Sequence, residues 1–297
     1  MQLDYDDTRW PELGDFRRAC LNDDFSRLKQ IADKGHDWYP SENPEGKTLA
    51  HLAQTFQWQY HASLANYDAL EALAANTEWG ATEPWTLQGW LPITQATASP
   101  GDGFDALRLL LRLGADARQL AGDPDDRANA VDMARYAGNE GLAAWLEHES
   151  SSEAPGTTLV IQKSREFTAG AENVFAALTT SSAIVECFPY DSVESSWQQG
   201  AEITLRGTAD GEPFTDYGTI EVLKPATAFQ YAYWSANHGT ERTAANHLRI
   251  RYDIKPTEAG CTLSVTHFDI RSETYRAMML GAWDMLLDAL AGYVAGS

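Results

Sequence analysis

The chain has 297 residues, 43% of them hydrophobic, and a formal net charge of −21. This length suits about two domains, and the hydrophobic share is enough to give each a core. Both halves are acidic, at −13 for residues 1–150 and −8 for residues 151–297, so we expect neither nucleic acid nor an anionic membrane as a partner.

The N-terminal segment and the cysteines favour a reducing compartment. The segment MQLDYDDTRW is acidic and polar, unlike a secretory or transit signal, and no apolar run reaches the roughly 18 residues of a membrane span. Cys20, Cys187 and Cys261 lie far apart without CxxC or Cys/His spacing, which favours structural thiols over disulfides or a zinc site. We therefore expect a cytoplasmic protein without a metal or cofactor.

Residues 1–150 contain a degenerate repeat. Its clearest copy has a leucine stripe that ends at Gly114, a residue able to form a left-handed helix cap. Other copies begin a helix with a similar short motif, in one case at Pro92. The copies are Phe16–Asp37, Thr48–Ala53, Leu91–Ala96 with Phe104–Ala117, and Asn129–Ala134 with Gly141–Leu146. This half resembles an ankyrin-repeat array of about four copies, which implies an all-α domain that docks a protein partner.

An aromatic-rich insert interrupts the repeats between Gln54 and Gly89. Two interpretations of its tryptophans, Trp79 and Trp85, and of the adjacent Trp90 stay open. The rings either cover the helical stack and fill irregular space, which we prefer, or form an exposed anchor for a partner.

The second half, residues 158–297, follows a polar linker at 151–157 that contains Pro155 and Gly156. Apolar and polar residues alternate through short runs, which predicts antiparallel strands, and the last stretch has helical spacing. The predicted order is a strand (158–167), a helix (171–184), five strands (202–207, 217–223, 228–235, 247–254 and 261–270) and a long helix (272–294).

This order resembles the helix-grip fold of the START and birch-pollen-allergen (SRPBCC) superfamily. More narrowly, it is similar to the domain of the activator of heat-shock protein 90 ATPase. The resemblance rests on Glu172–Phe175, Tyr217–Pro225, Phe229–Trp234, Cys261–His267 and Gly281–Leu287. The chain departs from the family between Phe188 and Trp197, where a tryptophan pair is expected. The implied fold is an α+β domain in which a curved antiparallel sheet surrounds a long C-terminal helix.

Strand parity predicts a largely apolar cavity between that sheet and that helix, because alternate side chains share one face. The predicted lining residues are Phe175, Phe188, Ile203, Leu205, Tyr231, Tyr233, Tyr252, His267, Met279 and Trp283. A filled core is the alternative interpretation of the same residues. His267 has no carboxylate or nucleophile that can be placed beside it, so we assign it to the cavity wall and predict no catalytic residue.

Three functions remain open. We prefer a non-catalytic binding protein, whose repeats dock a protein and whose second domain holds a small apolar ligand. The superfamily resemblance also admits a cyclase- or hydrolase-like enzyme acting on an aromatic or polyketide-like substrate. The narrower resemblance implies a factor that regulates heat-shock protein 90.

Overall fold

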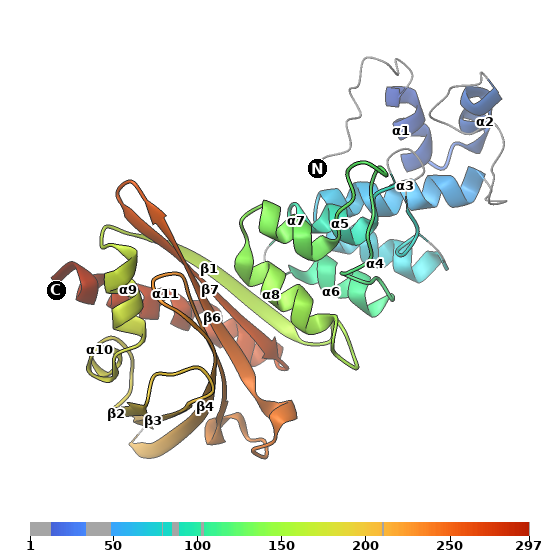
Figure 1. Cartoon of the computed structure of the whole chain (residues 1–297). Coiled ribbons are helices and arrows are strands. Elements are labelled where there is room, and N and C mark those ends of the chain that lie inside the picture. The colour runs from blue at the N-terminus through green and yellow to red at the C-terminus, as the bar shows by residue number, and fades with distance from the viewer. Residues whose placement is uncertain are drawn as a thin grey trace. The chain divides into compact units, whose positions relative to one another are not determined.

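The computed structural model describes residues 13–33, 49–78, 80–84, 89–101, 104–209 and 211–296 (Figure 1). The chain divides into two compact units, Met1–Thr157 and Thr158–Ser297. The described part of the first unit is mainly helical, whereas the second combines a sheet with helices.

The described residues of the first unit form helices in consecutive pairs. The helices are α1 (Leu13–Leu21), α2 (Phe25–Asp33), α3 (Leu49–Ser63), α4 (Tyr67–Asn76), α5 (Pro92–Thr97), α6 (Asp105–Arg112), α7 (Ala130–Tyr136) and α8 (Glu140–Glu149). Helix α1 contacts α3, α3 contacts α5, and α5 contacts α7, while each also contacts the helix that follows it. The unit is therefore a stack of helix pairs, and buried side chains such as Phe16, Leu28 and Phe56 fill one end of it.

Local sequence signals set several of these helix ends. Helix α5 begins at Pro92, as predicted, and the Thr94 hydroxyl accepts a hydrogen bond from the backbone N–H of Leu91. Gly114 has a φ of +92° just after α6, so the predicted left-handed cap is confirmed. The Asn129 side chain accepts a hydrogen bond from the third residue of α7, as an N-cap does.

The three tryptophans proposed as a partner anchor have different outcomes. Trp79 and Trp85 lie outside the described residues. Trp90 is 2% exposed, and its ring lies so close to Gly122 that a Cβ on that glycine would come within 2.7 Å of it. An exposed anchor is therefore wrong for Trp90, because the ring fills space inside the helical unit.

The second unit is built on a seven-stranded antiparallel sheet with the order β1-β7-β6-β5-β4-β3-β2. Its strands are β1 (Leu159–Phe167), β2 (Ser192–Ser195), β3 (Glu202–Ala209), β4 (Glu212–Lys224), β5 (Ala228–Ser235), β6 (Leu248–Thr257) and β7 (Gly260–Ile270). Two short 3-10 helices, η2 (Ala236–His238) and η3 (Ala244–Asn246), connect β5 to β6. Figure 1 shows the sheet curving around one side of the long helix α11 (Glu273–Gly296), as predicted.

Several details differ from the sequence prediction, including a broken helix, an additional strand and an earlier strand start. The helix expected at 171–184 is two helices, α9 (Ala171–Leu178) and α10 (Ser181–Cys187), because the hydroxyl residues between them compete for backbone hydrogen bonds. Strand β2 was not predicted, since it has only four residues and two of them are serines. Strand β4 begins five residues before the predicted start.

Helix α11 packs on the sheet along one side. Trp283, Leu287, Leu290 and Val294 are buried, and Asp284 forms a salt bridge with Lys163 of β1 at 2.8 Å. Among the described residues, α11 is also the helix that is long and apolar enough to cross a membrane, although the sequence prediction found no such run. One such helix is weak evidence for a span, because the core helix of a soluble protein passes the same test of length and composition.

The segment that joins the two units is hydrogen-bonded to the first unit, although the composition of this segment predicted a polar linker. The backbone N–H of Gly156 donates to the buried Glu149 carboxylate at 2.6 Å, and Arg112 donates to the Gly156 carbonyl at 3.1 Å. Residues 150–156 therefore continue the helical unit rather than extend freely from it.

Candidate ligand cavity

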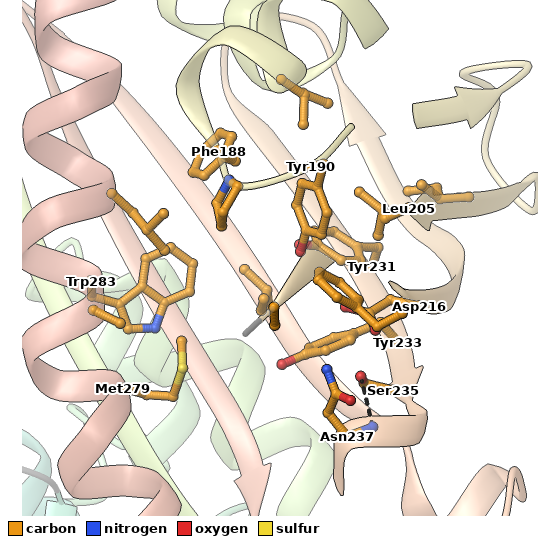
Figure 2. Close-up of a pocket in the computed structure, with 18 of the residues that line it drawn as sticks. Phe188, Tyr190, Leu205, Asp216, Tyr231, Tyr233, Ser235, Asn237, Met279 and Trp283 are labelled. Atoms are coloured by element: carbon orange, nitrogen blue, oxygen red, sulfur yellow. Dashed lines mark hydrogen bonds between the residues drawn. The ribbon is translucent and has the colours of Figure 1, made fainter. Parts of the chain in front are cut away.

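A cavity of about 630 Å³ lies between the curved sheet and α11 in the second unit (Figure 2). Helix α10 and residues 188–190 form another wall of the cavity, in addition to the sheet and α11. The lining is mostly aromatic and aliphatic, as in sites for small apolar molecules. The described lining residues are Leu178, Ile184, Phe188–Tyr190, Trp197, Ile203, Leu205, Thr208, Ala209, Phe214, Asp216, Phe229, Tyr231, Tyr233, Ser235, Asn237, His238, Ile250, Tyr252, Tyr275, Met278, Met279, Ala282, Trp283, Met285 and Leu286.

Strand periodicity builds the sheet side of this cavity. On β5, Phe229, Tyr231, Tyr233 and Ser235 lie two residues apart and all line it. Asp216 of β4 pairs with Ser235 across the ladder, so the carboxyl group reaches the same wall. Two neighbouring strands therefore each supply a polar group to an otherwise apolar surface.

Helical periodicity builds the opposite side. Tyr275, Met279 and Trp283 follow one another at intervals of four residues on α11, and Figure 2 shows Met279 and Trp283 facing the tyrosines of the sheet. Met278 and Met285 also line the cavity but are 57% and 69% exposed, so they lie at its rim. The mouth therefore carries flexible, polarizable side chains.

A hydrogen-bonded group of four aromatic side chains lies at one end of the cavity. The Tyr233 and Tyr275 hydroxyls are 2.8 Å apart, and the Tyr233 hydroxyl is 3.5 Å from His267 Nε2. The indole N–H of Trp283 donates to His267 Nδ1 at 3.2 Å. Because Nδ1 accepts this bond, neutral His267 carries its proton on Nε2 and presents it to Tyr233.

Burial keeps His267 neutral. The ring is fully buried, and this desolvation, reinforced by the nearby His238, lowers the pKa of His267 to about 3. Desolvation also raises the pKa values of Tyr231, Tyr233 and Tyr275, so their hydroxyls stay protonated and can donate hydrogen bonds at neutral pH. This end of the cavity is therefore polar but uncharged.

Asp216 is the exception in the lining. Its side chain is 6% exposed, and desolvation raises the pKa of the carboxyl group to about 6 against a lowering effect of the hydrogen bond to Ser235. Its Oδ1 atom has no hydrogen-bond partner among the described residues. At neutral pH the cavity wall thus contains a buried carboxylate with one oxygen available to a bound molecule.

A glycine on β3 makes room for this wall. A Cβ on Gly207 would lie 2.5 Å from the Phe214 ring and 2.8 Å from the Pro189 carbonyl oxygen. Since both Phe214 and Pro189 line the cavity, any larger residue at this position would displace the lining.

Eight of the ten predicted lining residues lie on the cavity wall: Phe188, Ile203, Leu205, Tyr231, Tyr233, Tyr252, Met279 and Trp283. The other two are displaced from it. Phe175 packs partly buried against the core, and His267 lies behind Tyr233 and Trp283, where it supports their side chains. The filled-core interpretation is therefore wrong for the space between β5 and α11.

Sequence reasoning missed Tyr190, Asp216 and Tyr275. Two signals were present: Asp216 shares strand parity with the inward Ile220, and Tyr275 lies four residues before Met279. Tyr190 follows the end of a helix in a loop, where no periodicity indicates its direction.

The described residues show no metal centre and no activated thiol. They contain no group of three or more His, Cys, Asp or Glu side chains placed to hold a metal ion. Cys20, Cys187 and Cys261 are buried, and desolvation raises the pKa of Cys187 to about 11. A thiolate nucleophile has no support at these positions.

A family model matches most of the second unit. Residues 168–295 match the family described as Activator of Hsp90 ATPase homolog 1-like protein. This match lies wholly within the second unit. Its antiparallel sheet and long C-terminal helix fit the helix-grip fold, which generally binds ligands. The match covers neither the first unit nor an ankyrin repeat, and no curated protein matches the chain.

Solved structures align with a similar share of the chain. A protein from Cytophaga hutchinsonii is 22% identical, with 46% of this chain and 94% of that chain covered and a TM-score of 0.42. CalU16 from Micromonospora echinospora is 18% identical over 46% of this chain and 75% of its own, with a TM-score of 0.36. CV1439 from Chromobacterium violaceum is 18% identical over 45% and 95%, with a TM-score of 0.38.

Proposed function

We propose that this protein is a non-catalytic two-module binding protein, whose helix-grip domain holds a small, largely apolar ligand. The observation that carries the proposal is the aromatic cavity of about 630 Å³ between β5 and α11. A hollow of this size with few polar groups favours an apolar molecule oriented by a small number of hydrogen bonds. The neutral Tyr233 and Tyr275 hydroxyls supply such bonds at one end.

The test compares a substitution that fills the cavity with a matched substitution on the exposed side of α11. Ala282 lines the cavity, whereas Ala289 is exposed on the same helix. We expect the neutral probe N-phenyl-1-naphthylamine to fluoresce on binding the wild type and the Ala289→Phe variant, and to bind Ala282→Phe at least about tenfold more weakly. Equal binding by both variants would place the probe outside the cavity and contradict the proposal.

We also propose that the first unit is an ankyrin-repeat array with a binding role of its own. Its helices stack as consecutive pairs, and the loops before α5 and α7 meet through a hydrogen bond from Gly122 N–H to Gly89 O at 2.9 Å. Ala121 and Ala128 form an antiparallel bridge within the second loop. Stacked helix pairs with short hairpins suit an extended surface for a protein partner.

The partner role of the first unit needs its own measurement. A partner captured by the full chain should also be captured by residues 1–157 and not by residues 158–297. Capture by residues 158–297 alone would assign the partner to the helix-grip domain instead.

A second candidate function is an enzyme of the cyclase or hydrolase type, and Asp216 is the observation that favours it. A buried carboxylate with a raised pKa can accept a proton, and tyrosine hydroxyls in the same cavity can stabilise developing negative charge on oxygen. Native mass spectrometry of freshly isolated protein would separate the two candidates. A hydrolase adds the mass of water to its co-purified molecule and a dehydrating cyclase removes it, and Asp216→Asn abolishes this conversion. The heat-shock protein 90 alternative rests on the family description alone.

A further inference from the structure

We propose that the cavity selects amphiphilic organic cations, with an ammonium group seated at Asp216 and an apolar body between β5 and α11. This inference rests on the proposed binding function and adds the chemical class of the ligand. It follows from the position of one carboxyl group, the surroundings of that group and the charges of the lining.

The first argument is the position of the carboxyl group. Asp216 lies in β4 between Leu205 of β3 and Ser235 of β5, with which it pairs in register. Its side chain is buried, lines the cavity and leaves Oδ1 without a hydrogen-bond partner among the described residues. An ammonium N–H donor from a ligand would satisfy that oxygen.

The second argument is a comparison with the other buried acids of the described chain. Asp253 is bound by Arg251 at 2.8 Å, Asp269 by Arg249 at 2.5 Å, and Glu149 by the Gly156 backbone N–H at 2.6 Å. Each of these three carboxylates thus receives an N–H donor from the protein. The described residues give Asp216 no such N–H donor, so its donor is left to a bound molecule.

The third argument is the aromatic surroundings. Figure 2 shows Asp216 beside Tyr231 and Tyr233, with Tyr190 adjoining them, and the ring centroids of Tyr231 and Tyr233 are 5.9 Å apart. The faces of such rings attract a cation, and a carboxylate among them adds a direct charge–charge attraction. Aromatic rings around one acid therefore suit an alkylammonium group better than a neutral hydroxyl.

The fourth argument is the charge of the lining as a whole. Among its described residues, Asp216 is the acid, and neither Lys nor Arg occurs. Burial lowers the pKa of His238, the histidine of the lining, so that this residue is neutral at neutral pH. An anionic ligand would meet no opposing charge and would be repelled by Asp216, whereas a cationic ligand would be attracted.

The test compares three ligands that share an apolar body and differ in head group. Octylamine, 1-octanol and octanoate displace N-phenyl-1-naphthylamine from the full-length protein at pH 7.5. We expect octylamine to displace the probe at about tenfold lower concentration than 1-octanol, with octanoate weakest, because a charge-assisted hydrogen bond exceeds a neutral one. Asp216→Asn should reduce the amine-to-alcohol ratio to about one, whereas Glu258→Gln, which removes a charge from an exposed turn, should keep the wild-type ratio.

The outcomes separate this inference from the binding function. If the probe binds the cavity, as judged by Ala282→Phe, but amine and alcohol displace it equally, the cation assignment is wrong and the binding function stands. If the probe does not bind the wild type, both proposals fail. Circular dichroism checks that Asp216→Asn folds. If it does not, the wild-type ratio decides, and a ratio near one overturns the assignment.

Discussion

Ionisation of the buried Asp216 carboxyl group at neutral pH lowers the free energy of unfolding. Its pKa is about 6 in the folded state, above the ordinary value of 3.8, so the folded state holds the proton more tightly than the unfolded state does. This loss of unfolding free energy is absent below about pH 4, grows as the pH rises to about 6 and reaches its full size above that pH. The shift corresponds to a cost on the order of 2–3 kcal/mol.

We expect Asp216→Asn to remove this pH-dependent cost. Relative to the wild type, the free energy of unfolding of the variant should rise by about 2 kcal/mol between pH 4 and pH 7. Urea unfolding followed by circular dichroism measures this difference in the transition of the second unit. The exposed Glu258→Gln variant is the matched control, and a difference that is flat with pH for Asp216→Asn would show that the carboxylate is solvated.

His267 changes the free energy of unfolding with pH in the opposite direction to Asp216. Its folded pKa of about 3 lies below the ordinary 6.5, so neutral burial stabilises the fold fully above about pH 6.5 and loses that effect as the pH falls toward 3. Relative to His267→Gln, the wild type should lose about 1.4 kcal/mol of unfolding free energy for each pH unit below 6.5. Unfolding at pH 7.5 and pH 5.0 tests this, with His247→Gln, outside the cavity, as the control. No change in the difference would mean that His267 is protonated in place.

The sequence predicts most side chains of the cavity wall because parity fixes direction once a strand is located. Tyr231 and Tyr233 follow from β5, whose bounds were predicted correctly. Asp216 was missed because β4 was predicted to begin at Tyr217, one residue too late to include it. His267 was assigned the correct face, but parity alone does not show that Tyr233 and Trp283 lie between its ring and the cavity.

At the scale of single elements, α5 depends on one buried hydroxyl. The Thr94 hydroxyl accepts from the Leu91 N–H at 3.1 Å and donates to the Leu91 carbonyl at 2.6 Å, at a helix of only six residues. Thr94→Val keeps the shape but leaves a buried N–H without an acceptor, so we expect a loss of about 1–2 kcal/mol in the free energy of unfolding. Urea unfolding of the first unit measures it.

The control for this substitution is in the same helix. Thr97 is equally buried, and its hydroxyl donates to the Ile93 carbonyl at 2.8 Å. Thr97→Val leaves no N–H without an acceptor, so its cost should be smaller. An equal loss of unfolding free energy for both substitutions would mean that the volume and packing of the side chain decide the effect, and not the hydrogen bond at the start of α5.

Predictions of elements succeeded where periodicity continued and failed where it was short. Strand β5 and helix α11 have clear alternation or helical spacing over at least eight residues. The break between α9 and α10 depends on hydroxyl residues that fit either a helix or its end, and β2 is too short to show a period. The pairing of β2 with β3 is decided by tertiary contacts that a single sequence does not contain.

The whole molecule consists of two compact units, which predicts two unfolding transitions rather than one. A ligand that binds only the helix-grip cavity should stabilise only the transition of the second unit. With N-phenyl-1-naphthylamine at about 100 times its Kd, that transition should gain about 2.7 kcal/mol while the other does not change. Differential scanning calorimetry of the full chain measures both transitions in one experiment.

The cavity variants identify which unit each transition belongs to. Ala282→Phe should abolish the shift caused by the probe, and Ala289→Phe on the exposed side of α11 should retain it. Thr94→Val should lower the other transition and leave the shift caused by the probe intact, because Thr94 belongs to the helical unit. One transition that moves as a whole in every variant would show that the two units unfold together, and binding in the cavity would then stabilise the helical array as well.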